Sequence, residues 1–459
     1  MNLFQATLFS LNTCAFLYLA VFILQFISLA RLGGWARKTI SRISVVSEWI
    51  FIAAFILHTF GLIGRWVIGG IDRPPWTNLY ESLIFFCWGL AFFHVIVQQK
   101  YRLQWLSAVT APIVFVVMGM AALTSNQNIE PLIPSLQSYW LKIHVVFGMV
   151  AYGAFSLSAC LGFLHLMRNG FSLRKISAGM ALLMLLNLFI AGGSEFFTKG
   201  EFHLARSTTR VLEDGSKIVV KDQYREYEKA PIVTRTEKLK TAPWLLGLAF
   251  FLYSFIAVYF LWSSRKYKPP YKKDISSDQA FKQGYDLSGM QKGLLWISLL
   301  VFIGFIFSIY FEARQFEYIT LRSNPYMFML IFTSGLFSLM YMLVIKSYKE
   351  FLSYLPSAKR LAELSYKNIL FAFPFQTLLL ITGAVWAYSA WGRAWGWDPK
   401  EIGALVTWLV YLIYLHGKLL MNWKDNTLSI LSLIGFGVMV FAFLGVNLVL
   451  SGLHSYGSA

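Results

Sequence analysis

The sequence predicts an all-α, polytopic integral membrane protein with about twelve transmembrane helices and a small external soluble insertion. Hydrophobic residues make up 57% of the 459 residues, whereas charged residues make up only 14%. Apolar runs of roughly 20 residues recur, and each is long enough to cross a bilayer as a helix. The formal net charge of +18 is spread over the loops between these runs. Membrane orientation explains this distribution better than nucleic-acid binding, so no nucleic-acid partner is expected.

The apolar runs set the order of the predicted helices. They lie near residues 5–30, 45–69, 78–98, 104–123, 140–166, 178–195, 243–263, 292–312, 326–346, 367–390, 402–421 and 427–450. The basic loops between them are 31–44, 99–103, 167–177, 264–291, 347–366 and 422–426. Because basic loops remain in the cytoplasm, both termini are expected outside. No basic segment precedes the first run, which is therefore expected to be an uncleaved span.

The loop 196–242 departs from this charge pattern. It is rich in Lys and Arg, yet the helix order places it outside. The orientation rule is weaker for long segments, and this loop is long enough to form a small domain. Within it, residues 210–220 (RVLEDGSKIVV) predict a β-hairpin with Asp214 and Gly215 at the turn.

The three cysteines are Cys14, Cys87 and Cys160. All three lie in apolar runs, and they form no C-x-x-C pair. Neither a disulfide framework nor a thiol redox site is predicted.

Residues 391–401 (WGRAWGWDPKE) form the most informative segment of the chain. Its two glycines and its proline predict a break between two helices. Its three tryptophans offer flat faces for a flat ligand, and Arg393 and Lys400 could neutralise acidic groups on that ligand. An aromatic belt at the lipid–water boundary would explain one or two tryptophans, but it explains the full cluster poorly. These residues are Trp391, Gly392, Trp395, Gly396, Trp397 and Pro399.

Two histidines share the predicted outer face with this strip. His144 lies just inside the outer end of the fifth predicted span, and His454 follows the last span. Neutral imidazole is a common axial ligand of haem iron, so two external histidines and an aromatic strip could ligate and cover a metalloporphyrin. The alternative is a pair of unrelated interfacial histidines. This alternative is less convincing, because both histidines share one membrane face with the tryptophans.

The remaining histidines differ in predicted depth. His416 lies about 14 residues into a span that starts near 402, roughly 21 Å from the outer face. At that depth it is expected to face the protein interior and to be functional. His58, also at mid-depth, is either a ligand or a core histidine bonded to a backbone carbonyl. His94 and His165 are expected at the cytoplasmic interface, and His203 in solvent.

The segment 74–86 (PPWTNLYESLIFF) places an acid, Glu81, near the outer mouth of a predicted span. A partner such as Arg65 or Arg73 is expected for it. A purely structural motif that begins the helix is an equally good interpretation of this segment.

Four segments together carry a resemblance to a known family. Residues 391–416 (WGRAWGWDPKEIGALVTWLVYLIYLH) resemble the tryptophan-rich signature of the haem-handling (WWD-domain) family. The segments NLYESLIFF, WLKIHVVFGMVAYGAFSLS and FLGVNLVLSGLHSYG narrow the resemblance to the CcsA (ResC) family of the system II cytochrome c biogenesis pathway. The resemblance covers roughly 45–166 and 350–457.

The resemblance implies a function and a set of ligands. The chain would bind haem b externally, and His144 and His454 would be its iron ligands. His416 would be a transient ligand within the membrane, opposite a histidine from another chain. The other residues implied in cofactor binding are Trp391, Trp395, Trp397, Asp398 and Arg393. No catalytic nucleophile is expected in this chain.

The resemblance also implies partners and a location. The chain would work with a CcsB (ResB)-like membrane protein and a thiol-reducing pathway to attach haem by thioether bonds to an apocytochrome c with a CxxCH motif. It would be a subunit of a cytochrome c synthase (haem lyase) in the bacterial inner membrane, with a plastid thylakoid membrane as the alternative. The alternative functions are a haem exporter or chaperone without ligation activity, and a b-type cytochrome of an electron-transfer complex.

The pattern divides the chain into three parts. Residues 1–166 form an N-terminal membrane bundle, and residues 350–459 form the haem-handling region. Residues 167–349, with extra helices and the external loop 196–242, are expected to be an insertion that departs from the family pattern. The resemblance implies no role for this middle part.

Overall fold

The computed structural model of the chain contains two compact units. It describes residues 2–30, 37–70, 72–103, 106–122, 129, 137–169, 174–182, 184–185, 203–206, 209–211, 217–219, 236–238, 242–265, 287–313, 319–321, 352 and 355–445. The first unit comprises Met1–Phe171 and Val344–Ala459, and the second comprises Ser172–Leu343.

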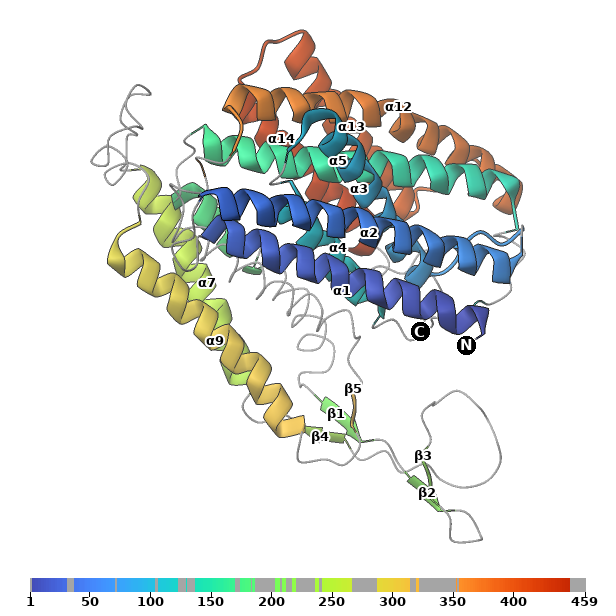
Figure 1. Ribbon diagram of the computed structural model, residues 1–459, viewed down its shortest axis with the longest axis horizontal. Helices are drawn as coiled ribbons and strands as arrows, with labels where there is room; N and C mark the ends of the chain where they lie inside the picture. The colour runs from blue at the N-terminus through green and yellow to red at the C-terminus, as the bar shows by residue number, and fades with distance from the viewer. Residues whose placement is uncertain are drawn as a thin grey trace. The chain divides into compact units, whose positions relative to one another are not determined.

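The first unit is a bundle of long helices (Figure 1). Its described helices are α1 (Leu3–Ala30), α2 (Arg37–Gly69), α3 (Leu79–Tyr101), α4 (Ser107–Ala122), α5 (Tyr139–Arg168), α12 (Ala358–Trp391), α13 (Pro399–Leu419) and α14 (Asp425–Val440), followed by a π-helical turn, η2 (Phe441–Gly445). Helix α1 packs on α2 and α4, and α3 packs on α4. Helix α5 contacts α12, α14 and α3, so it joins the N-terminal helices to the C-terminal ones.

Eight helices of the described residues are long and apolar enough to cross a membrane, and they belong to α1, α2, α3, α5, α7, α12, α13 and α14. Helix α4 and the segment Gly289–Phe305 are apolar but shorter. These helices confirm the prediction of a polytopic helical membrane protein. The predicted spans at 178–195 and 326–346 fall mostly or wholly outside the described residues, whereas the other predicted spans each coincide with a described helix.

Small residues bring the helices of the first unit close together. A Cβ atom on Gly153 of α5 would lie 2.8 Å from the backbone of Gly89 on α3, so these helices touch there through their main chains. Deeper in the bundle, the Ser158 hydroxyl lies 2.8 Å from that of Ser365 and 3.3 Å from that of Ser432. Small residues and interhelical hydroxyl contacts are the ordinary means of packing helices in a membrane.

The second unit contains α7 (Ala242–Arg265) and α9 (Gly289–Ala313), which pack on each other. It also contains the described strands β1 (His203–Arg206), β2 (Thr209–Val211), β3 (Lys217–Val219), β4 (Thr236–Lys238) and β5 (Ile319–Leu321). Strands β2 and β3 pair antiparallel, with Val211 opposite Lys217. This pairing confirms the predicted hairpin, whose expected turn residues Asp214 and Gly215 lie outside the described residues.

The sequence does not reveal one feature of this unit. Strand β1 pairs antiparallel with β4 on one side and with β5 on the other. Since β5 follows α9, the small sheet combines residues of the loop 196–242 with residues from a later connection. The predicted soluble insertion is thus not formed by one continuous segment.

Candidate functional site

The tryptophan-rich strip, residues 391–398, is a sharp break between α12 and α13. Helix α12 ends at Trp391, and Gly392 adopts a left-handed conformation with φ 72° while its N–H donates to the carbonyl of Tyr388. Glycine accepts this conformation without strain. Helix α13 then begins at Pro399, where a missing N–H costs no helical hydrogen bond. The predicted helix break is therefore confirmed.

Two carboxylates hold the strip in shape. Glu401 Oε2 accepts hydrogen bonds from the backbone N–H groups of Gly396 (2.7 Å) and Asp398 (3.1 Å). Asp398 is buried, and it caps α13 by accepting from the N–H of Lys400 (3.3 Å). This reciprocal capping box fixes the direction in which the chain leaves the strip. It gives Asp398 a structural part in the site, alongside the cofactor contact that the resemblance implies.

The aromatic side chains of the strip are partly open to the surroundings. Trp397 is 69% exposed and has a positive φ of 58°, which is unusual for a residue with a side chain. Its ring meets that of half-buried Trp395 edge to face, with centroids 5.8 Å apart. The side chain of Arg393 is exposed, and its guanidinium lies so close to Gly396 that a Cβ there would come within 2.6 Å of it. The strip thus presents flat apolar faces beside a cation.

His144 on α5 lies against the end of α12 that leads into this strip. Its Nδ1 is 2.9 Å from the carbonyl oxygen of Leu379. A carbonyl only accepts hydrogen bonds, so Nδ1 carries the proton and Nε2 carries the lone pair of a neutral imidazole. The ring stacks on Trp386 with centroids 6.0 Å apart, and Trp386 in turn lies 4.9 Å from Trp391. His144 is thereby linked to the strip through two aromatic contacts.

A glycine makes room for this histidine. A Cβ atom on Gly383 would lie 2.8 Å from both Cε1 and Nδ1 of His144. Leu379, Gly383 and Trp386 are spaced four and three residues apart, so they lie on one face of α12. That face supplies the hydrogen-bond acceptor, the space and the stacking surface for the His144 ring.

His416 lies in the predicted span, but its side chain does not face the way that the sequence predicts. It is in the last turn of α13, about 26 Å along the helix from Pro399. Its side chain is exposed on the outside of the described unit rather than facing its interior. The reason is that it falls on the same helical face as four exposed aliphatic residues. Its Nδ1 lies 2.9 Å from the carbonyl oxygen of Leu412. The four aliphatic residues are Ile402, Val406, Leu409 and Ile413.

Two histidines expected at the cytoplasmic interface are buried within the bundle. His94 is fully buried, with Nε2 3.1 Å from Glu48 Oε2. His165 joins three helices, because its nitrogens contact the carbonyl of Ala358 (2.8 Å) and the side chain of Asn426 (3.1 Å). Both residues lie toward helix ends that border basic loops, so their place at the interface stays a prediction. Their burial was not predicted, because an apolar sequence pattern does not reveal which polar partners other helices bring.

The other histidines are placed only in part. His58 is fully buried beside Tyr18, with ring centroids 6.2 Å apart. Neither of its ring nitrogens forms a hydrogen bond within the described part of the chain, so the expected bond to a backbone carbonyl is not seen there. The backbone of His203 lies in β1, its side chain is outside the described residues, and His454 falls outside them altogether.

Glu81 has both of its expected partners. Its Oε1 lies 2.9 Å from Nη2 of Arg65 and 3.0 Å from Nη1 of Arg73. Its Oε2 accepts from the backbone N–H and the hydroxyl of Thr77, at 3.0 and 2.8 Å. Glu81 and Arg65 are fully buried. This cluster ties α2, the following loop and the start of α3 together.

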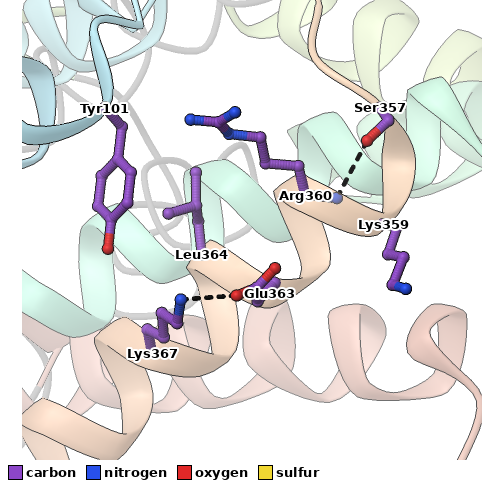
Figure 2. Close-up of a pocket in the computed structure, with 7 residues that line it drawn as sticks. All are labelled: Tyr101, Ser357, Lys359, Arg360, Glu363, Leu364 and Lys367. Atoms are coloured by element: carbon purple, nitrogen blue, oxygen red, sulfur yellow. Dashed lines mark hydrogen bonds and ion pairs between the residues drawn. The ribbon is translucent and has the colours of Figure 1, made fainter.

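A pocket of about 300 Å³ lies at the opposite end of α12, against the last residue of α3 (Figure 2). It is lined by Tyr101, Ser357, Lys359, Arg360, Glu363, Leu364 and Lys367. Figure 2 shows Glu363 directed at Lys367, with 2.6 Å between their charged atoms. Of the seven lining residues only Leu364 is buried. The pocket is therefore a solvated, charged surface and offers no buried ligand atom.

Comparison with known proteins places most of the chain in one family. The family profile described as "Cytochrome C assembly protein" matches residues 76–228 and 244–454. A protein of Trichodesmium erythraeum (strain IMS101) named "Cytochrome c biogenesis protein CcsA" is 28% identical over 386 residues, which cover 83% of this chain and 80% of that protein. A protein of the same name from Marchantia polymorpha is 26% identical over 440 residues, which cover 95% and 94%. The matched residues include the strip, His144, His416 and His454.

Proposed function

Because the chain belongs to the cytochrome c assembly protein family, we propose that it binds haem b and presents it externally for covalent attachment to apocytochrome c. Its relatives bear the name cytochrome c biogenesis protein CcsA. In this proposal haem is the substrate that the chain moves and positions. The chain acts with a CcsB (ResB)-like membrane protein, and the acceptor carries a CxxCH motif.

The orientation of His144 is the observation that carries this proposal. Histidines that ligate metals usually donate their second ring N–H to a carbonyl or carboxylate, which fixes the tautomer and the ring plane. His144 donates Nδ1–H to the carbonyl of Leu379, and its ring is further held by Trp386. This arrangement supports Nε2 of His144 as one axial ligand, and His454 is the proposed second ligand.

The strip supplies the remaining contacts. The faces of Trp395 and Trp397 suit stacking on a porphyrin, because large aromatic rings bury much apolar area. The guanidinium of Arg393 suits pairing with a haem propionate, since its planar donors match carboxylate geometry. Trp391 reaches the same site through its contact with Trp386. The site fits a flat, dianionic substrate.

His416 suits a different step. An ionisable side chain on an apolar, membrane-facing surface is costly, and such residues usually meet another polar group. Since Nδ1 is bonded within α13, Nε2 is the atom directed to a partner. We propose that the exposed face of α13 contacts the CcsB-like protein. His416 would ligate haem iron transiently, before haem reaches the external site.

The chemistry of attachment adds an acceptor thiol across each haem vinyl group. The acceptor brings both thiols, kept reduced by a thiol-reducing pathway, so no nucleophile of this chain is required. This chain contributes orientation, which is a recognised source of rate when two groups must meet in one geometry. The proposed location is the bacterial inner membrane with both termini external; a plastid thylakoid membrane is the alternative.

One experiment separates this function from its two rivals. The chain, a CcsB-like partner and a reporter apocytochrome c are co-expressed, and covalent haem on the reporter is measured after denaturation. A synthase subunit yields covalent haem, whereas a haem exporter or chaperone yields only dissociable haem. A b-type cytochrome of an electron-transfer complex would retain haem within the bilayer and leave the reporter unmodified. The contacts of His94 argue against that last function. Both of its ring nitrogens are engaged by Glu48 and Thr110, so neither is free to ligate haem iron.

A further inference from the structure

A buried ion-pair site lies within the membrane-spanning part of α1–α4, and its residues are not among those assigned to haem. Glu48 of α2 and His94 of α3 are 7% and 0% exposed, and their charged atoms lie 3.1 Å apart. Both residues lie inside candidate spans, Arg42–Gly69 and Tyr80–Tyr101, at roughly 10 Å from the ends that border the basic loops. Ionisable groups at such depth mark functional sites by default.

Every polar atom of this pair has a hydrogen-bond partner. Glu48 Oε2 contacts His94 Nε2, and Glu48 Oε1 accepts from the Ser107 hydroxyl at 2.5 Å. Ser107 in turn accepts from the side-chain amide of Gln25 at 2.8 Å. His94 Nδ1 lies 2.8 Å from the hydroxyl of Thr110. Four helices therefore contribute to a single polar network.

The Thr110 hydroxyl gives the network two arrangements of hydrogen bonds. It lies within reach of two acceptors, His94 Nδ1 at 2.8 Å and the carbonyl of Leu106 at 3.1 Å. When it donates to Leu106, His94 Nδ1 must carry a proton and donate to Thr110. A second proton then lies between Nε2 and Glu48 Oε2, and the pair is neutral overall. When Thr110 donates to Nδ1 instead, Nε2–H donates to ionised Glu48, and the pair carries one negative charge.

Both arrangements satisfy all the polar atoms, and they differ by one proton. Rotation of one hydroxyl is the only rearrangement required. The pair lies within membrane-spanning helices, where a lone charge is costly. The Phe51 ring also covers His94, with centroids 3.8 Å apart. The geometry is that of a site that can gain and lose a proton without breaking its hydrogen-bond network.

Toward the basic loops, the next charged residues along α2 and α3 are Arg42 and Lys100, which lie six residues from Glu48 and from His94. Helices α1 and α4 contain no Asp, Glu, Lys, Arg or His. On α2 and α3, the ion pair of Arg65 with Glu81 lies at the opposite ends of the helices. His58 lies ten residues beyond Glu48 on α2, about 15 Å along the helix. Tyr18 of α1 and Cys87 of α3 are neutral titratable groups that lie closer to the level of His58 than to that of Glu48.

We propose that Glu48 and His94 form an intramembrane proton-binding site that exchanges one proton with solvent at the end bordered by the basic loops. The route to that end follows Ser107 and Gln25 to Ser44, whose hydroxyl lies 3.2 Å from the Gln25 amide nitrogen. The proton comes from water and returns to water, and no electron moves. This activity goes beyond the proposed haem function and does not depend on it.

A pH titration of the purified full chain, followed by infrared difference spectroscopy, tests the proposal. We expect one protonation change, visible in carboxylic acid or imidazolium bands, that disappears in Glu48→Gln and in His94→Gln. The exposed variant Glu363→Gln is the control and should retain it. A wild-type protein labelled with ¹⁵N-histidine should show the same change at a buried imidazole. If the wild-type protein shows no titrating buried histidine or carboxyl group while it remains folded, the pair is static and the proposal is wrong.

A matched pair of variants tests the hydroxyl. Thr110→Val keeps the shape of the side chain but leaves the Nδ1–H of the protonated form without an acceptor. Because an unpaired buried N–H is costly, the midpoint should move about one unit to lower pH. Thr110→Ser retains the hydroxyl and should titrate as the wild type does. Equal midpoints in the two variants would show that Thr110 plays no part in the exchange and would overturn the two-state arrangement.

Discussion

His144 Nδ1 and the carbonyl oxygen of Leu379 lie 2.9 Å apart and join α5 to α12 beside the tryptophan-rich strip. This hydrogen bond directs Nε2 of the ring, and it depends on the absence of a side chain at position 383. A Cβ there would lie 2.8 Å from the ring, which is closer than packed atoms approach.

Gly383→Ala should therefore displace the His144 ring and lower haem occupancy without removing the ligand. We expect at least a several-fold loss of the Soret absorbance per protein in preparations from haem-replete cells. The matched control is Gly437→Ala on α14, where an added Cβ meets open space. Unchanged occupancy in Gly383→Ala would mean that the position of His144 does not limit haem binding.

His416→Ala should reduce haem loading and leave the spectrum of the remaining haem unchanged. The reason is its position, about 26 Å along α13 from the strip, which is too far for it to share an iron with an external ligand. Leu409→Ala, on the same exposed face, removes apolar area but no ligand and is the control. A changed axial-ligand spectrum at full occupancy in His416→Ala would place this histidine at the external site after all.

The sequence predicts the helices well because each one follows from a local property, a run of apolar residues long enough for a bilayer. The break at 391–398 is equally local, since Gly392 and Pro399 act on their own backbone. The partners of Glu81 were also predictable, because two arginines precede it by 16 and 8 residues in the sequence. Local chemistry therefore accounts for these parts of the fold.

Tertiary contacts account for what the sequence did not predict. Glu48 and His94 are 46 residues apart and meet only because α2 and α3 pack antiparallel. The exposure of His416 depends on which face of α13 its neighbours leave uncovered. Likewise, the pairing of β1 with β5 joins connections that lie on either side of the described helices α7 and α9. None of these relationships leaves a periodic signal in the residues concerned.

Loss of the buried carboxylate at position 81 should destabilise the protein strongly. Glu81→Gln leaves two buried or nearly buried guanidinium groups without their counter-charge, and breaking such a pair costs about 3–5 kcal/mol. Thermal unfolding in detergent should show a clear fall in Tm. The control is Glu363→Gln, whose pair with Lys367 is exposed and should contribute little. Similar Tm values for both variants would contradict this account.

The loop 196–242 should be external and dispensable for haem binding. It lies in the second compact unit, whereas His144 and the strip lie in the first. A deletion of 196–242 removes β1 and β4, so β5 loses its pairing partner and some local change is expected. Protease added to sealed spheroplasts should cleave this loop in the wild type. A deletion variant that inserts and folds yet loses all haem would refute its dispensability.

His144 and His454 should ligate the same iron from opposite faces. Replacing either residue by alanine should remove one axial ligand and impair maturation of a reporter cytochrome c. Imidazole is small enough to occupy the vacated position and supply the missing nitrogen, so it should restore part of the activity. The double variant needs two imidazole molecules and should be harder to restore than either single variant.

Trp395→Ala is the matched comparison for these histidine variants. It should loosen haem through lost stacking area while both ligands remain, so its spectrum should keep the wild-type axial signature and imidazole should bring no recovery. Maturation of the reporter, measured with and without imidazole across all four variants, separates ligation from stacking. Wild-type maturation by both single histidine variants without imidazole would exclude external ligation by this pair. In that case a site within the bilayer, as in a b-type cytochrome, would explain haem binding better.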